Sequence, residues 1–164
     1  MKKVALASAL AMSFAAGSGA APAAIVGETA ACARGDSAVL VRVGGFKAQR
    51  GTVRVQIYGS NPADFLAKGK KLKRVDVPVS GGRVDVCVDL PGPGNYAVAV
   101  RHDMDNNGKS GWNDGGGFSR NPRISLVHLR PSFNDVVIQV GSSVRTVDVT
   151  LNYRQGLSIG PVKG

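Results

Sequence analysis

Carboxylate and amide side chains alternate in the stretch HDMDNNGKSGWND, residues 102–114, which directly follows an apolar segment. From position 103 the order is D-x-D-x-N-G-x5-D, close to the pattern of calcium-binding loops. A hard cation takes six or more oxygen ligands, and alternate residues of a curled loop can direct their oxygens inward. The predicted calcium ligands are the side chains of Asp103, Asp105, Asn107 and Asp114 and the backbone carbonyl of Lys109.

A plain turn explains the same stretch without a metal. Asn107-Gly108 is a strong turn dipeptide, and aspartate side chains accept hydrogen bonds from nearby backbone N–H groups in Asx-turns. No helical pattern flanks the loop, so it is not an EF-hand, and Asp114 at position twelve with Gly111 at position nine predicts weak calcium binding. A loop of about 20 residues is uncommon unless something orders it, which favours the metal slightly. Both interpretations stay open.

Catalysis by this stretch is a third hypothesis. His102, Asp103 and Arg120 would be the residues of a hydrolase. Adjacent residues of a strand point to opposite faces, so His102 and Asp103 are poorly placed to bond to each other. His128 is isolated, and no serine or cysteine stands in a nucleophile motif. The sequence therefore favours a protein without enzymatic activity.

Short segments in which apolar and polar residues alternate run along most of the chain, the pattern of half-buried strands. Strands are expected at 38–43, 52–58, 71–79, 83–90, 96–102, 125–129, 135–140 and 144–153. The third and fourth of these, and the last two, are expected to form hairpins. Residues 96–102 are apolar on both faces, as in a central strand, and Pro78 indicates a sheet edge.

This pattern predicts an all-β fold: an antiparallel β-sandwich, immunoglobulin-like or prealbumin-like, of about seven strands with one long polar loop. A small closed barrel is the alternative. Trp112 and Phe118 in the long loop are expected to cover the core, because large aromatic side chains usually bury.

The chain begins like an exported protein. A basic start, Met1–Lys3, precedes the uncharged apolar run Val4–Ala16, and Ala21-Pro22-Ala23 fits a signal-peptidase site. The apolar run is too short to span a bilayer, and no later segment is long and apolar enough to do so. We expect a signal peptide at 1–23, an irregular segment at 24–37, the sandwich at 38–153 and a tail at 154–164. The expected location is periplasmic or secreted.

The two cysteines, Cys32 and Cys87, are an even number, which in an exported chain suggests a disulfide. In RVDVCVDL the valines alternate with Asp85, Cys87 and Asp89, so Cys87 is expected on the polar face of its strand. A bond from Cys32 would hold the N-terminal segment across that face and close a loop of about 56 residues, worth about 4 kcal/mol. Lipidation of Cys32 has less support, because GETAAC lacks the usual upstream leucine.

The chain is strongly basic. Its formal net charge of +10 falls to +8 with removal of the signal peptide, which carries Lys2 and Lys3 and no acid. Much of the charge lies in one run, and the candidate polyanion-binding residues are Lys68, Lys70, Lys71, Lys73 and Arg74. An anionic glycan or envelope surface is the partner such a run would bind; nucleic acid is disfavoured, because no aromatic stacking platform accompanies it. A solvated loop is the simpler alternative.

The segment GNYAVAVRHDMDNNGKSGWNDGGGFSRNP, followed by PSFNDVVIQV and VDVTLNY, resembles the bacterial family catalogued as domain of unknown function 2141. The resemblance covers most of residues 38–153 and implies an exported β-sandwich domain with no established activity. Gly111 departs from the family pattern, in which aspartate is common at that position, so one potential ligand is lost and Asp114 is the residue that compensates.

Composition and patterning together favour an exported, non-enzymatic binding or structural module of the periplasm or cell surface, with calcium as the only candidate cofactor. The hydrolase and the polyanion-binding protein remain as alternatives.

Overall fold

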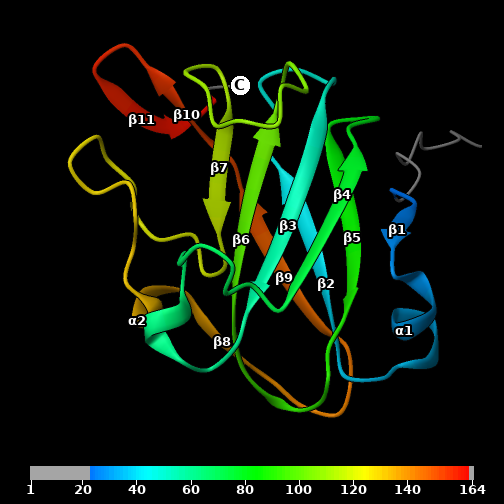
Figure 1. Ribbon diagram of the computed structural model, residues 1–164. Helices are drawn as coiled ribbons and strands as arrows, with labels where there is room; N and C mark the ends of the chain where they lie inside the picture. The colour runs from blue at the N-terminus through cyan, green and yellow to red at the C-terminus, as the bar shows by residue number, and fades with distance from the viewer. Residues whose placement is uncertain (1–22, 163–164) are drawn as a thin grey trace, which may run out of the picture.

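The computed structural model describes residues 23–162, and it is a sandwich of two β-sheets (Figure 1). The predicted signal peptide lies outside the described residues except for Ala23. The smaller sheet has the order β1-β5-β2-β9, with β1 at Ile25–Gly27, β5 at Arg83–Asp89, β2 at Ala38–Gly44 and β9 at Arg145–Thr150. The prediction of an all-β sandwich is confirmed.

The larger sheet has the order β11-β10-β7-β6-β3-β4, with β8 also paired to β6. Its strands are β3 (Thr52–Tyr58), β4 (Lys73–Pro78), β6 (Gly94–Asp103), β7 (Gly115–Phe118), β8 (Val137–Val140), β10 (Asn152–Gln155) and β11 (Ser158–Pro161). The described residues also contain two short helices, α1 at Thr29–Arg34 and α2 at Phe133–Val136, and a 3-10 turn at Pro62–Asp64. Most neighbouring strands are antiparallel, and two pairs, β1 with β5 and β2 with β9, are parallel.

Alternation of valines builds the core between the sheets. In β3, Val53, Val55 and Ile57 are fully buried and pack with the inward valines of the opposite sheet. The central strand β6 is buried on both faces, as predicted: Val98 and Val100 join the main core, and Ala97 and Ala99 lie under a second cluster with α2. The alanines are small because aromatic side chains cover that outer face. Strand β4, which ends at Pro78, is at an edge of its sheet, as predicted.

Both predicted hairpins are wrong. Strand β4 pairs with β3 and β5 pairs with β2, so the turn at 80–82 carries the chain from one sheet to the other. In the same way β8 pairs with β6, whereas β9 pairs with β2. Residues 125–129, predicted as a strand, contain only an isolated bridge between Ser125 and His128. Alternation identifies a half-buried strand but does not identify its partner, and that is why these pairings were missed.

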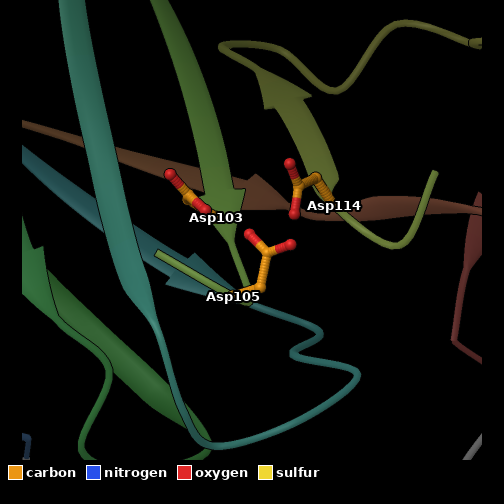
Figure 2. Close-up of side chains that lie close together, drawn as sticks. All are labelled: Asp103, Asp105 and Asp114. Atoms are coloured by element: carbon orange, nitrogen blue, oxygen red, sulfur yellow. The ribbon is translucent and has the colours of Figure 1, made fainter. Parts of the chain in front are cut away.

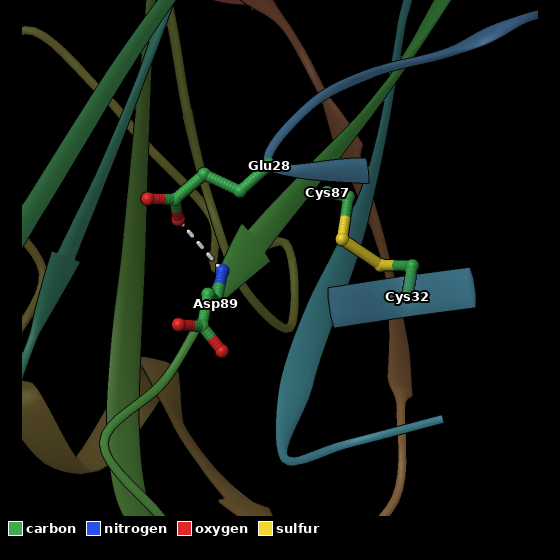
Figure 3. Close-up of a disulfide and its surroundings, with 4 residues drawn as sticks. All are labelled: Glu28, Cys32, Cys87 and Asp89. Carbon is green, nitrogen blue, oxygen red and sulfur yellow. Dashed lines mark hydrogen bonds between the residues drawn. A yellow bond between two sulfur atoms is a disulfide. The ribbon is translucent and has the colours of Figure 1, made fainter. Parts of the chain in front are cut away.

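The segment predicted to be irregular, 24–37, is ordered by the smaller sheet. Strand β1 lies parallel to β5, and α1 is linked to it by the predicted disulfide between Cys32 and Cys87 (Figure 3). Cys87 faces away from the main core and is buried in a separate cluster with Ala31 and Ala38. Glu28 adds a second tie, because its Oε2 accepts a hydrogen bond of 2.8 Å from the backbone N–H of Asp89. The predicted tail is likewise structured, since β11 pairs with β10.

Among residues 23–162, no helix is long and apolar enough to cross a membrane.

Candidate metal site

The stretch that matches a calcium loop joins two neighbouring strands of the larger sheet. Strand β6 ends at Asp103, β7 begins at Gly115, and His102 is paired with Gly115 across the two strands. Asp103 and Asp114 therefore lie side by side at the strand ends, and the intervening loop folds back so that Asp105 joins them. One carboxylate oxygen from each of the three lies within 4.8 Å of the others (Figure 2).

Asp103 is the buried member of this carboxylate cluster, with 4% of its surface exposed. Its Oδ2 accepts hydrogen bonds from the backbone N–H of Gly108, at 2.9 Å, and from Nη2 of Arg101, at 3.2 Å. Its Oδ1 is buried and has no hydrogen-bond partner among the described residues. An unpaired carboxylate oxygen removed from water is costly, and a cation bound to it would remove that cost.

The other two carboxylates are held by backbone N–H groups. Asp114 accepts from Met104 through Oδ1, at 3.1 Å, and from Gly111 through Oδ2, at 2.7 Å. Oδ1 of Asp105 accepts from the N–H of Asn107 at 3.1 Å, which is an Asx-turn. These bonds fix the positions of the acids before any ligand arrives.

The remaining predicted ligands serve the turn itself. Oδ1 of Asn107 accepts from the N–H of Lys109 at 2.7 Å, and its Nδ2 donates to Asp105 at 2.8 Å. Gly108 has φ of +75°, the left-handed conformation that glycine adopts without strain. The Lys109 side chain is exposed and forms no ion pair within residues 23–162. The loop is thus a set of Asx-turns that also gathers three carboxylates.

Arg101 was not singled out from the sequence, yet it is the cation nearest the cluster. Its guanidinium donates to Asp103, to the carbonyl of Gly108 at 3.0 Å and to Oγ of Ser110 at 3.3 Å. Three carboxylates and one guanidinium leave a formal charge of −2 at this end of the sheet. A divalent cation would neutralise that charge. Strand alternation could have indicated Arg101, because it lies two residues before Asp103 and on the same face.

Residues 41–148 match the model of a family described as an uncharacterized protein conserved in bacteria (DUF2141). The chain belongs to this family. No curated protein and no solved structure matches it. The matched range contains the whole carboxylate cluster of the DUF2141 domain, whereas Cys32 and the β10–β11 hairpin lie outside it.

His102 of the DUF2141 domain is a core residue rather than part of a cleft. It is fully buried, its Nε2 lies 2.6 Å from the carbonyl of Arg50, and its Nδ1 lies 2.7 Å from the hydroxyl of Tyr153. Because a carbonyl can only accept, Nε2 carries the hydrogen and Nδ1 accepts from Tyr153. Burial raises the pKa of Tyr153 to about 12, so the phenol keeps its proton.

Arg120, the third residue of the hydrolase hypothesis, donates to the carbonyl of Asn134 and lines a different hollow from the carboxylate cluster. No cleft found within residues 23–162 is lined by His102, Asp103 and Arg120 together. The convergence that the hydrolase hypothesis required is therefore missing.

The five basic residues predicted to bind a polyanion do not share one environment in the DUF2141 domain, because three of them are paired with acids. Lys70 lies 3.8 Å from Asp64, Lys73 lies 3.0 Å from Glu28, and Nε of Arg74 lies 2.9 Å from Asp76. The run also remains solvated in part, and Lys68 and Lys71 form no ion pair with a described residue. Only these two of the five predicted residues line the hollow on the outer face of the larger sheet.

Trp112, which was expected to cover the core, is 71% exposed, so that prediction is wrong. The guanidinium carbon of Arg154 lies 3.5 Å from the centre of its ring. Phe118 does pack on the second core cluster, against Phe65. The loop between Asp103 and Asp114 is held by its own hydrogen bonds, so its order does not depend on burial of Trp112 in the core.

Proposed function

We propose that this protein is an exported, non-enzymatic binding or structural module of the periplasm or cell surface, and that calcium stabilises its 103–114 loop. The observation that supports the calcium site is the buried, unpartnered Oδ1 of Asp103 beside two further carboxylates. The disulfide between Cys32 and Cys87 supports export, because such bonds persist in oxidising compartments.

The donor set suits a hard, oxygen-seeking cation. Asp103, Asp105 and Asp114 supply carboxylate oxygens, and Asn107 and the carbonyl of Lys109 complete the predicted set with water. No histidine or cysteine belongs to the cluster among the described residues, which disfavours zinc. Arg101 offsets part of the negative charge, so binding is expected in the weak range of extracellular sites, with a Kd of about 10⁻⁴–10⁻³ M.

Thermal unfolding with calcium and with chelator tests this proposal. At 100 times its Kd, calcium should stabilise the folded state by about 2.7 kcal/mol, which raises Tm by roughly 5–10 °C for a domain of this size. Asp105→Asn should reduce the gain, because it removes one of the three negative charges that attract the cation. Asp105 is exposed, so the change disturbs no core contact. The calcium-free stability of this variant should stay close to that of the wild type.

Asp148→Asn is the matched control, since it removes one exposed carboxylate on β9, away from the cluster. This variant should keep the full calcium response. If the wild type melts at the same temperature in 10 mM calcium and in chelator, the loop is a plain turn and the calcium proposal fails.

A further inference from the structure

A hollow of about 910 Å³ lies on the outer face of the larger sheet. We call it the basic groove. Its floor is formed by β3, β6 and β7 through residues such as Gln56, Ala99 and Phe118. One wall is formed by residues 66–69 and Lys71, and the other by four residues of the segment 124–130: Ile124, Leu126, Leu129 and Arg130. In Figure 1 the latter segment and the β10–β11 hairpin lie on the same side of β7.

Charge in the basic groove is almost entirely positive. It is lined by one acid, Asp114, and by five bases: Lys68, Lys71, Arg101, Arg130 and Arg154. Arg101 is paired with Asp103, whereas Lys68, Lys71 and Arg130 have no acidic partner within residues 23–162. Cations left unpaired around a hollow raise its potential and attract an anion. The bases come from both walls, from the floor and from β10, so the favoured anion carries several charges along its length.

Apolar surface in the basic groove points to the same kind of ligand. Trp112, the single tryptophan of the chain, lines the groove, is 71% exposed and is stacked with Arg154. Leu129 is 54% exposed on the second wall. Large exposed apolar side chains beside a hollow are typical of binding sites, and an indole face packs well against the C–H face of a sugar ring.

Two other classes of anion fit less well. A single-stranded nucleic acid needs successive aromatic platforms, but Tyr58 is 4% exposed and Phe118 packs on the second core cluster, so Trp112 stands alone. A lipid acyl chain needs an enclosed apolar cavity, whereas this hollow is an open groove with bases on several sides. We infer that the basic groove binds an acidic oligosaccharide, with sugar rings against Trp112 and carboxylate or sulfate groups on Lys68, Lys71 and Arg130.

This inference goes beyond the proposed function and does not depend on calcium. It retains only Lys68 and Lys71 from the basic run, and it adds Arg130 and Trp112, which composition alone did not indicate. The occupant is an extended chain rather than a compact anion, because the bases come from separate elements around a hollow of about 910 Å³.

Fluorescence of Trp112 provides a reporter inside the groove, since no other tryptophan contributes. The probes are an oligosaccharide of hyaluronate, which carries carboxylates, one of heparin, which also carries sulfates, and uncharged chitohexaose. We expect saturable changes in emission with one or both acidic probes and none with chitohexaose. Affinity should fall as salt rises from 50 to 200 mM, because ions are released on binding.

Two double variants with the same loss of charge distinguish binding in the groove from a general effect of the protein's positive charge. Lys68→Gln/Lys71→Gln should weaken binding about tenfold, the effect of losing about 1.4 kcal/mol of charged contacts. Lys70→Gln/Lys73→Gln removes the same charge from lysines that lie outside the groove and are paired with Asp64 and Glu28, so it should change affinity less than about twofold.

Equal loss in both double variants would overturn the inference, since binding would then follow net charge alone. Tighter binding of a single-stranded oligonucleotide or of anionic vesicles than of either acidic oligosaccharide would also overturn it, as would the absence of any Trp112 response. All titrations are done in chelator and again in calcium. A Trp112 response in chelator supports the groove even where the calcium experiment fails, so the two failures are distinguishable.

Discussion

Replacing Tyr153 with phenylalanine removes one hydroxyl group from the core, where the ring lies against Gly115, the residue that follows Asp114. That hydroxyl is the hydrogen-bond donor to Nδ1 of His102, and both residues are at most 1% exposed. The histidine cannot adapt by changing tautomer, because moving the hydrogen to Nδ1 would leave Nε2 facing the carbonyl of Arg50 with two acceptors in contact. The substitution therefore leaves a buried nitrogen without a partner.

The expected cost is about 1–3 kcal/mol, the penalty for an unsatisfied buried polar group, with almost no packing term because phenylalanine keeps the ring. Tyr58→Phe is the matched control. Tyr58 is 4% exposed, and no hydrogen bond of its hydroxyl is found among the described residues, so this change should cost less than about 0.5 kcal/mol.

Urea unfolding followed by circular dichroism measures both changes, and pH supplies a second readout. The pKa of Tyr153 is raised from 10.0 to about 12 by burial. The wild type should therefore lose stability as pH rises from about 10 through 12, because the unfolded chain ionises this phenol first. The difference in free energy of unfolding between the wild type and Tyr153→Phe should therefore become smaller as pH rises from about 10 to 12. Equal stability of the two proteins at pH 7, or a gap that widens in alkali, would refute the structural role assigned to the pair.

Two further predictions concern the N-terminal part of the chain. Cys32→Ala/Cys87→Ala should lower the free energy of unfolding by about 4 kcal/mol, from the entropy of a closed loop with a sequence separation of 55. Urea unfolding measures the change, and a loss below about 1 kcal/mol would contradict a stabilising bond. Intact-mass analysis of the exported fraction should find a chain that begins near Ala24, and a species that retains Met1–Ala16 would contradict export.

Strand identity was readable from the sequence because burial on one face imposes a period of two, and most predicted strands exist at nearly the predicted residues. The pairing was not readable. The turn at 80–82 looks like a hairpin turn, yet Val77 and Val84 on either side of it contribute to the core from opposite sheets. Nothing local distinguishes a chain that returns within its sheet from one that crosses to the other.

Strand β7 shows a second limit. Its sequence, GGGF, has neither β-branched residues nor alternation, and it was predicted as part of a long loop. The glycines are required by space: a Cβ on Gly115 would lie 2.5 Å from the Tyr153 ring, and one on Gly117 would lie 2.7 Å from the carbonyl oxygen of Thr150. A close approach of backbone to the rest of the sandwich favours glycine here, and a propensity scale interprets the same glycines as a loop.

For the candidate site, the spacing of the oxygen-bearing residues predicted which acids lie together. Asp103 ends β6, and Asp114 immediately precedes β7, which is its neighbour in the sheet. Spacing did not predict the unpaired Oδ1 of Asp103, which follows from burial at the strand end. It also did not predict the exposure of Trp112. The exposure of Trp112 depends on the Asx-turns of the loop, whose side-chain to backbone hydrogen bonds cannot be deduced from an alternation of apolar and polar residues.

The carboxylate cluster and the basic groove meet at two residues. Arg101 lines the groove and donates to Asp103, and Asp114 belongs to both. A cation among the carboxylates would compete with Arg101 for Asp103. Because Arg101 and Asp114 contribute to both sites, a substitution at either residue alters both. Asp105 does not line the groove, and Lys68 lies outside the cluster, so these are the positions at which the two proposals separate. Any coupling between the sites must be reciprocal: if calcium raises affinity for an anion, that anion raises affinity for calcium by the same factor.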